Sequence, residues 1–274
     1  MKKLLLAFDA DHFSEGAFNF AQQLNKLQPV LLTGVFLPLY DRVNLWNYAD
    51  GLSGYDFLPM LDEKNVESGH KNIQLFESLC QKNGITFTIH KDFFDFALPE
   101  LQKETRFSDV MLISSEKFHP NAKTDDASAY LQDILKATEC PVIVVPETFT
   151  FPARNVLLVV ETASSIYAIK QFAYLFPELC TNETILVFTQ TGKKEPLQDE
   201  PYIEELVSQH FTNLTVCRSE ANPEACAKSW AGKDKGALVV CGPHGHSSFA
   251  RLFKKSFLTN IIDTHQLPVF IAHM

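Results

Sequence analysis

The segment ALVVCGPHGHSSFARLFKKS, residues 237–256, decides how this chain folds. It opens with an apolar run, passes through Gly242 and Gly245, and ends at Ser256. A short apolar run that is bounded by glycine and proline is typical of a buried strand. An amphipathic stretch follows Ser256 and ends before Pro268. This order predicts a buried strand, a glycine-bearing turn, a basic loop and then a helix that begins near Ser256.

The predicted turn and helix start have the chemistry of a phosphate site. Backbone N–H groups at such positions lack partners and can bind an anion, and a serine hydroxyl at the helix start suits both capping and phosphate contact. Arg251, Lys254 and Lys255 add positive charge. Two simpler interpretations stay open: the glycines can supply positive φ without any ligand, and the basic residues can form an ordinary solvated loop.

The spacing of Gly242, Gly245 and Ser256 resembles the nucleotide loop of the universal stress protein family. ATP-binding members of that family carry glycine, two residues, glycine, nine residues and then Gly-Ser. Lys255 stands where the third glycine would be; its side chain can obstruct a phosphate or supply a phosphate-binding charge, and the sequence does not choose between them. The resemblance implies an ATP site, with Mg²⁺, that uses these four residues and Phe257.

In the same family a carboxylate at the end of the first strand contacts the nucleotide. The resemblance assigns this role to Glu161 in the second half of the chain, whereas the first half carries Asp9. The first-half loop, residues 114–126, has no glycine, and Asp125 and Asp126 would repel phosphate near the helix start. Because those acids also suit helix capping, we expect the first half not to bind ATP.

The chain contains two copies of one unit. Residues 2–9 align with 154–161, residues 109–114 with 236–241, and residues 140–145 with 267–272. Self-similarity on this scale indicates a duplicated domain rather than a short-repeat array. We predict an N-terminal domain over 1–147, a C-terminal domain over 153–274, and a connection near Pro146 to Pro152.

Each half alternates apolar runs with helical patterns, which predicts a parallel sheet covered on both faces. The fold class is therefore α/β with two doubly wound domains; the family resemblance implies five parallel strands in the order 3-2-1-4-5 in each. The predicted strands are 3–8, 29–36, 85–89, 109–114 and 141–145, then 155–160, 183–189, 213–218, 236–241 and 268–272. The predicted helices are 13–27, 60–83, 95–105 and 127–138, then 163–176, 200–210, 222–231 and 256–265.

Composition limits the function classes. The 274 residues are 46% hydrophobic and carry a formal charge of −9 with a pI of about 5.5. This gives no global basic surface for nucleic acid, and no apolar run reaches the roughly 20 residues that span a membrane. The six cysteines form no CxxC pair. Buried free thiols and a cytoplasmic location fit this pattern best.

One insertion distinguishes the first half from the second. Residues 38–59 are rich in tyrosine and other aromatic residues and have only a short polar counterpart in the second half. Clustered aromatic side chains can mark a protein partner surface, but we favour a lid or short helices packed on the host domain, since exposed hydrophobic residues need no explanation until they form a patch. Besides an internal pseudo-dimer, a homodimer is a further expectation.

Metal and catalytic sites receive little support. His244 and His246 lie near Cys241, but no zinc-site spacing is present, so we expect no metal site. Neither a phosphate loop of the GxxxxGK[ST] form nor a GxSxG elbow occurs. We therefore expect no enzyme, with weak ATP hydrolysis left open. The resemblance implies a stress-linked regulatory protein with a nucleotide site in its second half; the alternative is a partner-binding scaffold that has lost ATP.

Overall fold

The computed structural model describes most of both halves of the chain. The described residues are 1–9, 12–37, 63–90, 97–116, 134–160, 162–188, 199–217, 236–242 and 267–273. The predicted helices 222–231 and 256–265, the aromatic insertion 38–59 and most of the predicted helix 127–138 lie outside these residues, so they stay predictions.

The first half alternates strands and helices as its sequence predicts. Its elements, in chain order, are β1 (Lys2–Asp9), α1 (Glu15–Leu27), β2 (Val30–Leu37), α3 (Glu63–Lys82), β3 (Thr86–His90), α4 (Ala97–Arg106), β4 (Val110–Ser114) and β5 (Val142–Val145). Residues 134–137, just before β5, are also helical.

The second half repeats this alternation. Its elements are β6 (Arg154–Val159), α6 (Thr162–Leu175), the short 3₁₀ helix η1 (Pro177–Thr181), β7 (Glu183–Phe188), α7 (Glu200–His210), β8 (Asn213–Cys217), β9 (Ala237–Cys241) and β10 (Val269–Ile271). Each predicted strand of both halves is present within about two residues of its expected ends, as is usual for element boundaries.

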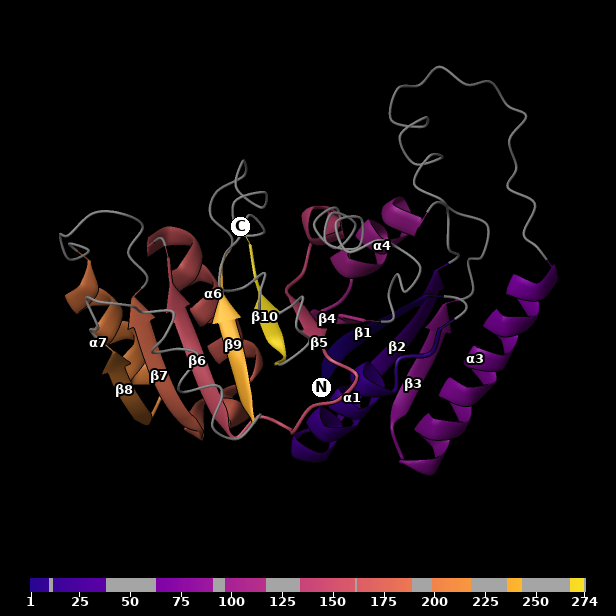
Figure 1. The fold of residues 1–274 in the computed structure, drawn as a ribbon, viewed down its shortest axis with the longest axis horizontal. Coiled ribbons are helices and arrows are strands. Elements are labelled where there is room, and N and C mark those ends of the chain that lie inside the picture. Colours follow the sequence, from indigo (N-terminus) through magenta and orange to yellow (C-terminus); the bar gives the residue numbers. More distant parts are fainter. Residues whose placement is uncertain are drawn as a thin grey trace, which may run out of the picture.

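The strands form one sheet in the order β3-β2-β1-β4-β5-β10-β9-β6-β7-β8. Within each half the neighbouring strands are parallel, and counting within each half gives the order 3-2-1-4-5 twice. The halves join where β5 pairs antiparallel with β10, with Ile143 opposite Phe270; both strands lie near the middle of Figure 1. The predicted α/β doubly wound class is confirmed. The continuous sheet across the junction was not predicted, and the domain boundaries at 147 and 153 stay predictions.

The sheet carries a hydrophobic core on each face because successive strand residues point to opposite sides. In β1, Leu4, Leu6 and Phe8 join one core, together with residues of α1, α3, α6 and α7. Leu5 and Ala7 join the other core, together with Leu101 of α4. Every residue named here is buried, which explains why the strands read as continuous apolar runs rather than alternating ones.

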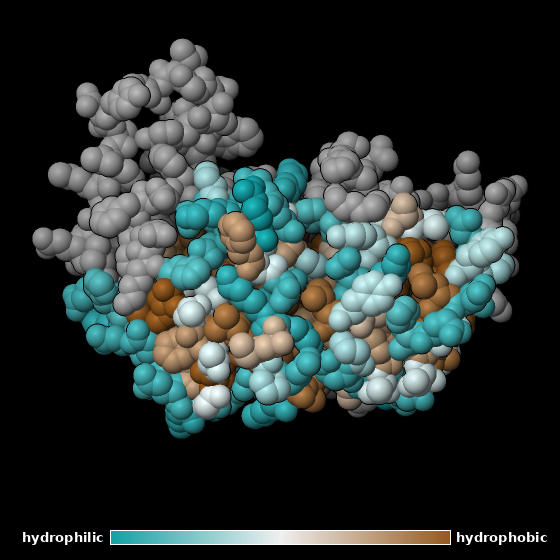
Figure 2. All heavy atoms as spheres, turned by 180° about the vertical axis from the view of Figure 1, so that it is seen from behind, coloured by the Kyte–Doolittle hydropathy of each residue, from teal (hydrophilic) through white to brown (hydrophobic). Residues whose placement is uncertain are grey.

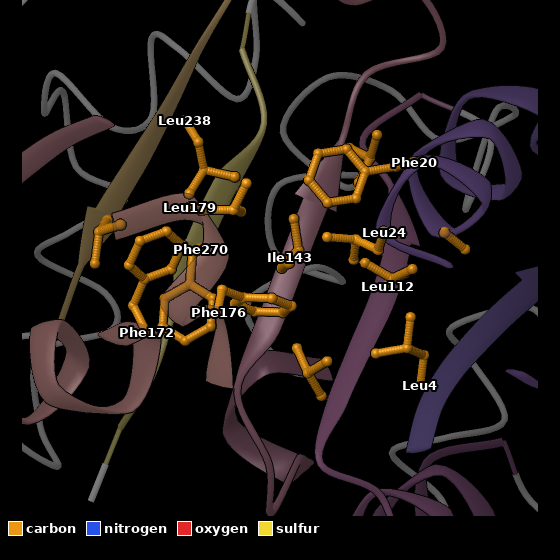
Figure 3. Close-up of a cluster of buried hydrophobic side chains, with 14 of the residues drawn as sticks. Leu4, Phe20, Leu24, Leu112, Ile143, Phe172, Phe176, Leu179, Leu238 and Phe270 are labelled. Atoms are coloured by element: carbon orange, nitrogen blue, oxygen red, sulfur yellow. The ribbon is translucent and has the colours of Figure 1, made fainter. Parts of the chain in front are cut away.

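The first of these cores crosses the junction between the halves. Figure 3 shows Ile143 of the first half between Phe176 of the second half and the first-half residues Leu24 and Leu112, and all four belong to one core cluster. Phe270 makes ring contacts with Phe172 and Phe176, at centroid distances of 5.3 and 6.2 Å. Such aromatic pairs add to the free energy that burial itself contributes. The two halves therefore share one core rather than two separate ones.

A charged pair reinforces the junction on the same side. The Lys2 ammonium lies 2.5 Å from a carboxylate oxygen of Glu178 and 4.9 Å from the ring centre of Phe176. Both charged side chains are largely buried, so the attraction is screened less than at an open surface. The first strand of one half is thus held to the segment that follows α6 in the other.

Exposed hydrophobic side chains are spread over several elements. Among the described residues, the large exposed ones include Leu27, Leu75, Phe107, Tyr174 and Tyr202. On the face seen in Figure 2, hydrophobic side chains appear between hydrophilic ones. Singly exposed apolar residues are normal in folded proteins and need no functional explanation. No helix among the described residues is long and apolar enough to cross a membrane.

Candidate functional site

Of the six residues predicted to bind nucleotide, the structure describes Gly242. The other five, Gly245, Ser256, Phe257, Glu161 and Lys255, lie outside the described residues, so their roles stay predictions. Of Asp9 the structure describes the backbone, as the last residue of β1. The candidate site is therefore built from the elements that surround Gly242 and from the equivalent place in the first half.

Gly242 lies at the carboxyl end of β9, directly against the first turn of α6. A Cβ atom at this position would lie 2.0 Å from the carbonyl oxygen of Ser164 and 2.8 Å from the backbone nitrogen of Ser165. Only glycine permits this approach of strand end and helix. Gly84 is the glycine of the described residues that has a positive φ, at 63°. The interpretation of Gly242 as a positive-φ turn residue is therefore wrong; close packing requires the glycine.

The start of α6 contains a buried hydroxyl group with unmet hydrogen-bonding capacity. The hydroxyl of Ser165 accepts a hydrogen bond from the Val160 N–H at 3.1 Å. The neighbouring Ser164 side chain is buried, and its Oγ has no hydrogen-bond partner. No acidic residue occupies the first turn of α6. A buried polar atom without a partner is costly and calls for an explanation, and a ligand beside Gly242 would provide one.

The equivalent region of the first half is built differently, around Glu147. This residue follows β5 and lies in the stretch that we predicted as the connection between domains. Its Oε1 accepts hydrogen bonds from the hydroxyls of Ser14, at 2.5 Å, and Ser114, at 2.7 Å. Its Oε2 accepts one from the Gly16 N–H at 3.2 Å. We call these four residues the Glu147 site.

Local sequence explains how three elements meet at the Glu147 site. Ser14 is the N-cap of α1 and accepts a hydrogen bond from the Ala17 N–H at 3.0 Å. Ser114 is the last residue of β4. Gly16 lets the chain after β5 approach α1, because a Cβ there would lie 2.3 Å from the carbonyl oxygen of Pro146. Sequence reasoning missed Glu147, since its partners lie 133, 131 and 33 residues away in the chain.

The structure does not support a metal role for the cysteine beside the loop. Cys241 is fully buried, burial raises the pKa of its thiol to about 12, and its Sγ donates to the Phe270 carbonyl at 3.7 Å. Among the described residues, no group of three or more His, Cys, Asp or Glu side chains could hold a metal ion. His244, His246 and His265 lie outside those residues.

The remaining cysteines partly contradict the expectation of free thiols. Cys80, Cys140 and Cys180 are free and buried, as Cys241 is, and burial raises the pKa of each to about 12. Cys217, the last residue of β8, is disulfide-bonded. The expectation of buried free thiols therefore does not hold for Cys217. A disulfide is unusual for a reducing compartment, so Cys217 counts against the argument that led from the cysteines to a cytoplasmic location.

Comparison with known proteins gives the fold. No protein-family model matches the sequence, and no curated protein matches it. Among solved structures, a universal stress protein from Archaeoglobus fulgidus DSM 4304 aligns over 99% of this chain and 96% of its own, with a TM-score of 0.64 and 15% identity. The protein has the universal stress protein fold. At this identity the likeness shows the fold and not the ligand.

The universal stress protein fold also relates this chain to part of a transporter. The cytoplasmic domain of a prokaryotic cation chloride cotransporter aligns over 98% of this chain and 94% of its own, with a TM-score of 0.50 and 11% identity. Chains with this architecture thus occur both as universal stress proteins and as a domain of a larger membrane protein, which is why the function must be argued from the site.

Proposed function

We propose that this protein is a stress-linked regulatory protein that binds an adenine nucleotide, with Mg²⁺, in its second half. Doubly wound folds bind ligands beyond the carboxyl ends of the strands, where the strand order reverses. In the second half this place lies between β6 and β9, which are neighbours in the sheet. Gly242 ends β9 there, and the predicted loop residues follow it directly in the chain.

The observation that carries the proposal is the difference between the two halves at this place. In the first half the Glu147 carboxylate already occupies the donors at the start of α1. In the second half the start of α6 has no acidic residue in its first turn, and the Ser164 hydroxyl is buried without a partner. The helix dipole favours an anion at such a place. A phosphate-bearing ligand fits these described residues.

Each predicted loop residue has a role in this proposal. Gly245 and Ser256 present backbone N–H and hydroxyl groups to the phosphates, Lys255 adds positive charge, and Phe257 lines the site. Glu161, two residues beyond β6 in the sequence, faces the ribose or the base. We infer binding without turnover, because the sequence contains no catalytic motif. A cytoplasmic location, a protein partner at residues 38–59 and a homodimer complete the working hypothesis.

The test is a calorimetric titration of nucleotide-free protein with ATP and Mg²⁺. We expect a dissociation constant in the micromolar range, about −8 kcal/mol. Gly245→Asp should abolish binding, because it places a negative charge and a side chain where the phosphates approach. Gly84→Asp is the matched control: it makes the same chemical change at a turn in the first half, and it should leave binding intact. Absence of binding by the unaltered, folded protein would contradict the proposal.

A second candidate function has one observation in its favour. The approach of Gly242 to the Ser164 carbonyl explains that glycine by packing alone, with no ligand. This suits a partner-binding scaffold that has lost the nucleotide. The scaffold predicts that a partner binds through the aromatic insertion and that ATP changes its affinity by less than about twofold. If ATP changed the partner's affinity by about 5- to 150-fold, as is typical of allosteric coupling, that result would contradict the scaffold function.

A further inference from the structure

The Glu147 site has the hydrogen-bonding pattern of an anion receptor. The hydroxyl of Ser14 accepts from the Ala17 N–H, and the hydroxyl of Ser114 accepts from the Glu116 N–H at 3.2 Å. Because each hydroxyl oxygen already accepts a backbone proton, its own proton is directed at the Glu147 carboxylate. Together with the Gly16 N–H, three donors from the described residues converge on the two carboxylate oxygens. Such charge-assisted hydrogen bonds are stronger than neutral ones.

The receptor is buried and comes from two different elements. Ser14 and Ser114 are each 3% exposed. Without the carboxylate, bulk water would reach the two hydroxyl groups only at a cost in free energy. Ser14 and Gly16 belong to the start of α1, whereas Ser114 ends β4. The positive end of the α1 dipole adds to the attraction for an anion.

Its position is the ligand-binding place of this kind of fold. The strand order reverses between β1 and β4, which are hydrogen-bonded neighbours. α1 follows β1, so its first turn and the end of β4 lie at the same edge of the sheet. Ligands of doubly wound folds bind in the crevice at this reversal. In the first half, a carboxylate of the chain itself lies at that place.

We propose that the Glu147 site is an oxyanion site of the first half that the chain fills with its own carboxylate. The carboxylate is held at high effective concentration, because it lies two residues beyond β5 in a stretch that Gly16 allows to pack on α1. It keeps phosphate and other free oxyanions out of the first half. The inference rests on the first half alone and does not require that the second half bind a nucleotide.

The test removes the carboxylate and supplies a free oxyanion. In Glu147→Ala the three donors remain but lose their acceptor, so the variant should unfold at a lower temperature than the unaltered protein. Inorganic phosphate should then occupy the site and raise the midpoint of thermal unfolding by about 5 °C at saturation. Chloride at the same ionic strength should give no such rise.

Glu147→Gln is the matched control. The glutamine has the size of the native side chain and keeps the site filled, but it carries no charge. It should lower the unfolding temperature without creating the phosphate response that is expected of Glu147→Ala. Any phosphate that binds in the second half affects all three proteins alike, so it cancels in the comparison. The double variant Glu147→Ala/Ser114→Ala should show a smaller phosphate response than Glu147→Ala, because one donor is gone.

The possible outcomes separate the alternatives. A phosphate response that is specific to Glu147→Ala supports the proposal. A folded Glu147→Ala without that response overturns it and leaves Glu147 as an anchor of the connection to α1. An equal response in Glu147→Gln also overturns it, since the anion then acts elsewhere. If Glu147→Ala does not fold in chloride, it can be refolded from urea in phosphate instead. Recovery of the folded protein supports the proposal, and failure to recover it overturns the proposal.

Discussion

Two adjacent serines at the start of α6 have opposite hydrogen-bonding states. Ser165 accepts a hydrogen bond from the Val160 N–H, whereas the buried Ser164 hydroxyl has no partner. Without a ligand, Ser164→Ala should therefore leave the free energy of unfolding unchanged or raise it by up to about 1 kcal/mol, because it removes a desolvated polar group and inserts a better helix former. Ser165→Ala, the matched control, should lower it by about 1 kcal/mol.

Urea unfolding followed by circular dichroism measures both variants. If Ser164→Ala lost as much stability as Ser165→Ala, the Ser164 hydroxyl would have to be hydrogen-bonded in solution, and it would no longer indicate a ligand at the start of α6. If Ser164→Ala kept its stability but bound ATP more weakly than Ser165→Ala, the hydroxyl would be assigned to the ligand. Comparison of the two variants thus shows whether the Ser164 hydroxyl contributes to stability or to ligand binding.

At the scale of elements, the end of β9 and the first turn of α6 are packed as closely as glycine allows. In Gly242→Ala the new methyl group would overlap the Ser164 carbonyl, so strand end and helix must separate. We expect a loss of about 2–3 kcal/mol in the free energy of unfolding. Gly84→Ala is the control, because its Cβ meets nothing within 4 Å but its φ is 63°; it should lose about 1–2 kcal/mol.

Comparison of the two urea midpoints decides this prediction. A smaller loss in Gly242→Ala than in Gly84→Ala would mean that the end of β9 moves away from α6 easily. In that case the close approach would not explain Gly242, and the ligand-based interpretation of this glycine would gain weight. A larger loss would leave packing as a sufficient reason for the glycine.

The elements themselves could be predicted from sequence because their signals are local. The buried parallel strands appear as short apolar runs, and α1 follows an N-cap serine, Ser14, as capping rules require. The junction could not be predicted in the same way. Val142–Val145 and Val269–Ile271 are ordinary apolar strands, and nothing local in them shows that they pair with each other and in antiparallel direction.

The candidate site was predictable to a smaller extent. Glycine and serine spacing drew attention to Gly242, but the physical reason for that glycine lies in the Ser164 backbone, 78 positions earlier in the printed numbering. Glu147 was invisible for the same reason, because the donors of its carboxylate come from α1 and β4. Contacts between distant segments leave no periodic pattern that a single sequence can reveal.

At the scale of the whole molecule, the two halves should unfold together. They share a continuous sheet through β5 and β10, a core that contains Ile143 and Phe270, and the partly buried Lys2–Glu178 pair. Phe176 is central to this arrangement: it is 1% exposed, contacts Phe270 and lies beneath the Lys2 ammonium. Phe176→Ala should therefore lower the free energy of unfolding by about 3–5 kcal/mol.

Hydrogen exchange read by mass spectrometry distinguishes a shared core from two independent ones. In a single cooperative unit, Phe176→Ala should reduce the protection of β1 and of β7 by the same factor, although the substitution lies in the second half. Tyr174→Ala, at an exposed position in the last turn of α6, two residues before Phe176, should change both by little, since surface substitutions stay within about 0.5 kcal/mol. Loss of protection in β7 with β1 unchanged would show that the halves unfold separately, and that the antiparallel junction joins the two sheets without coupling their stability.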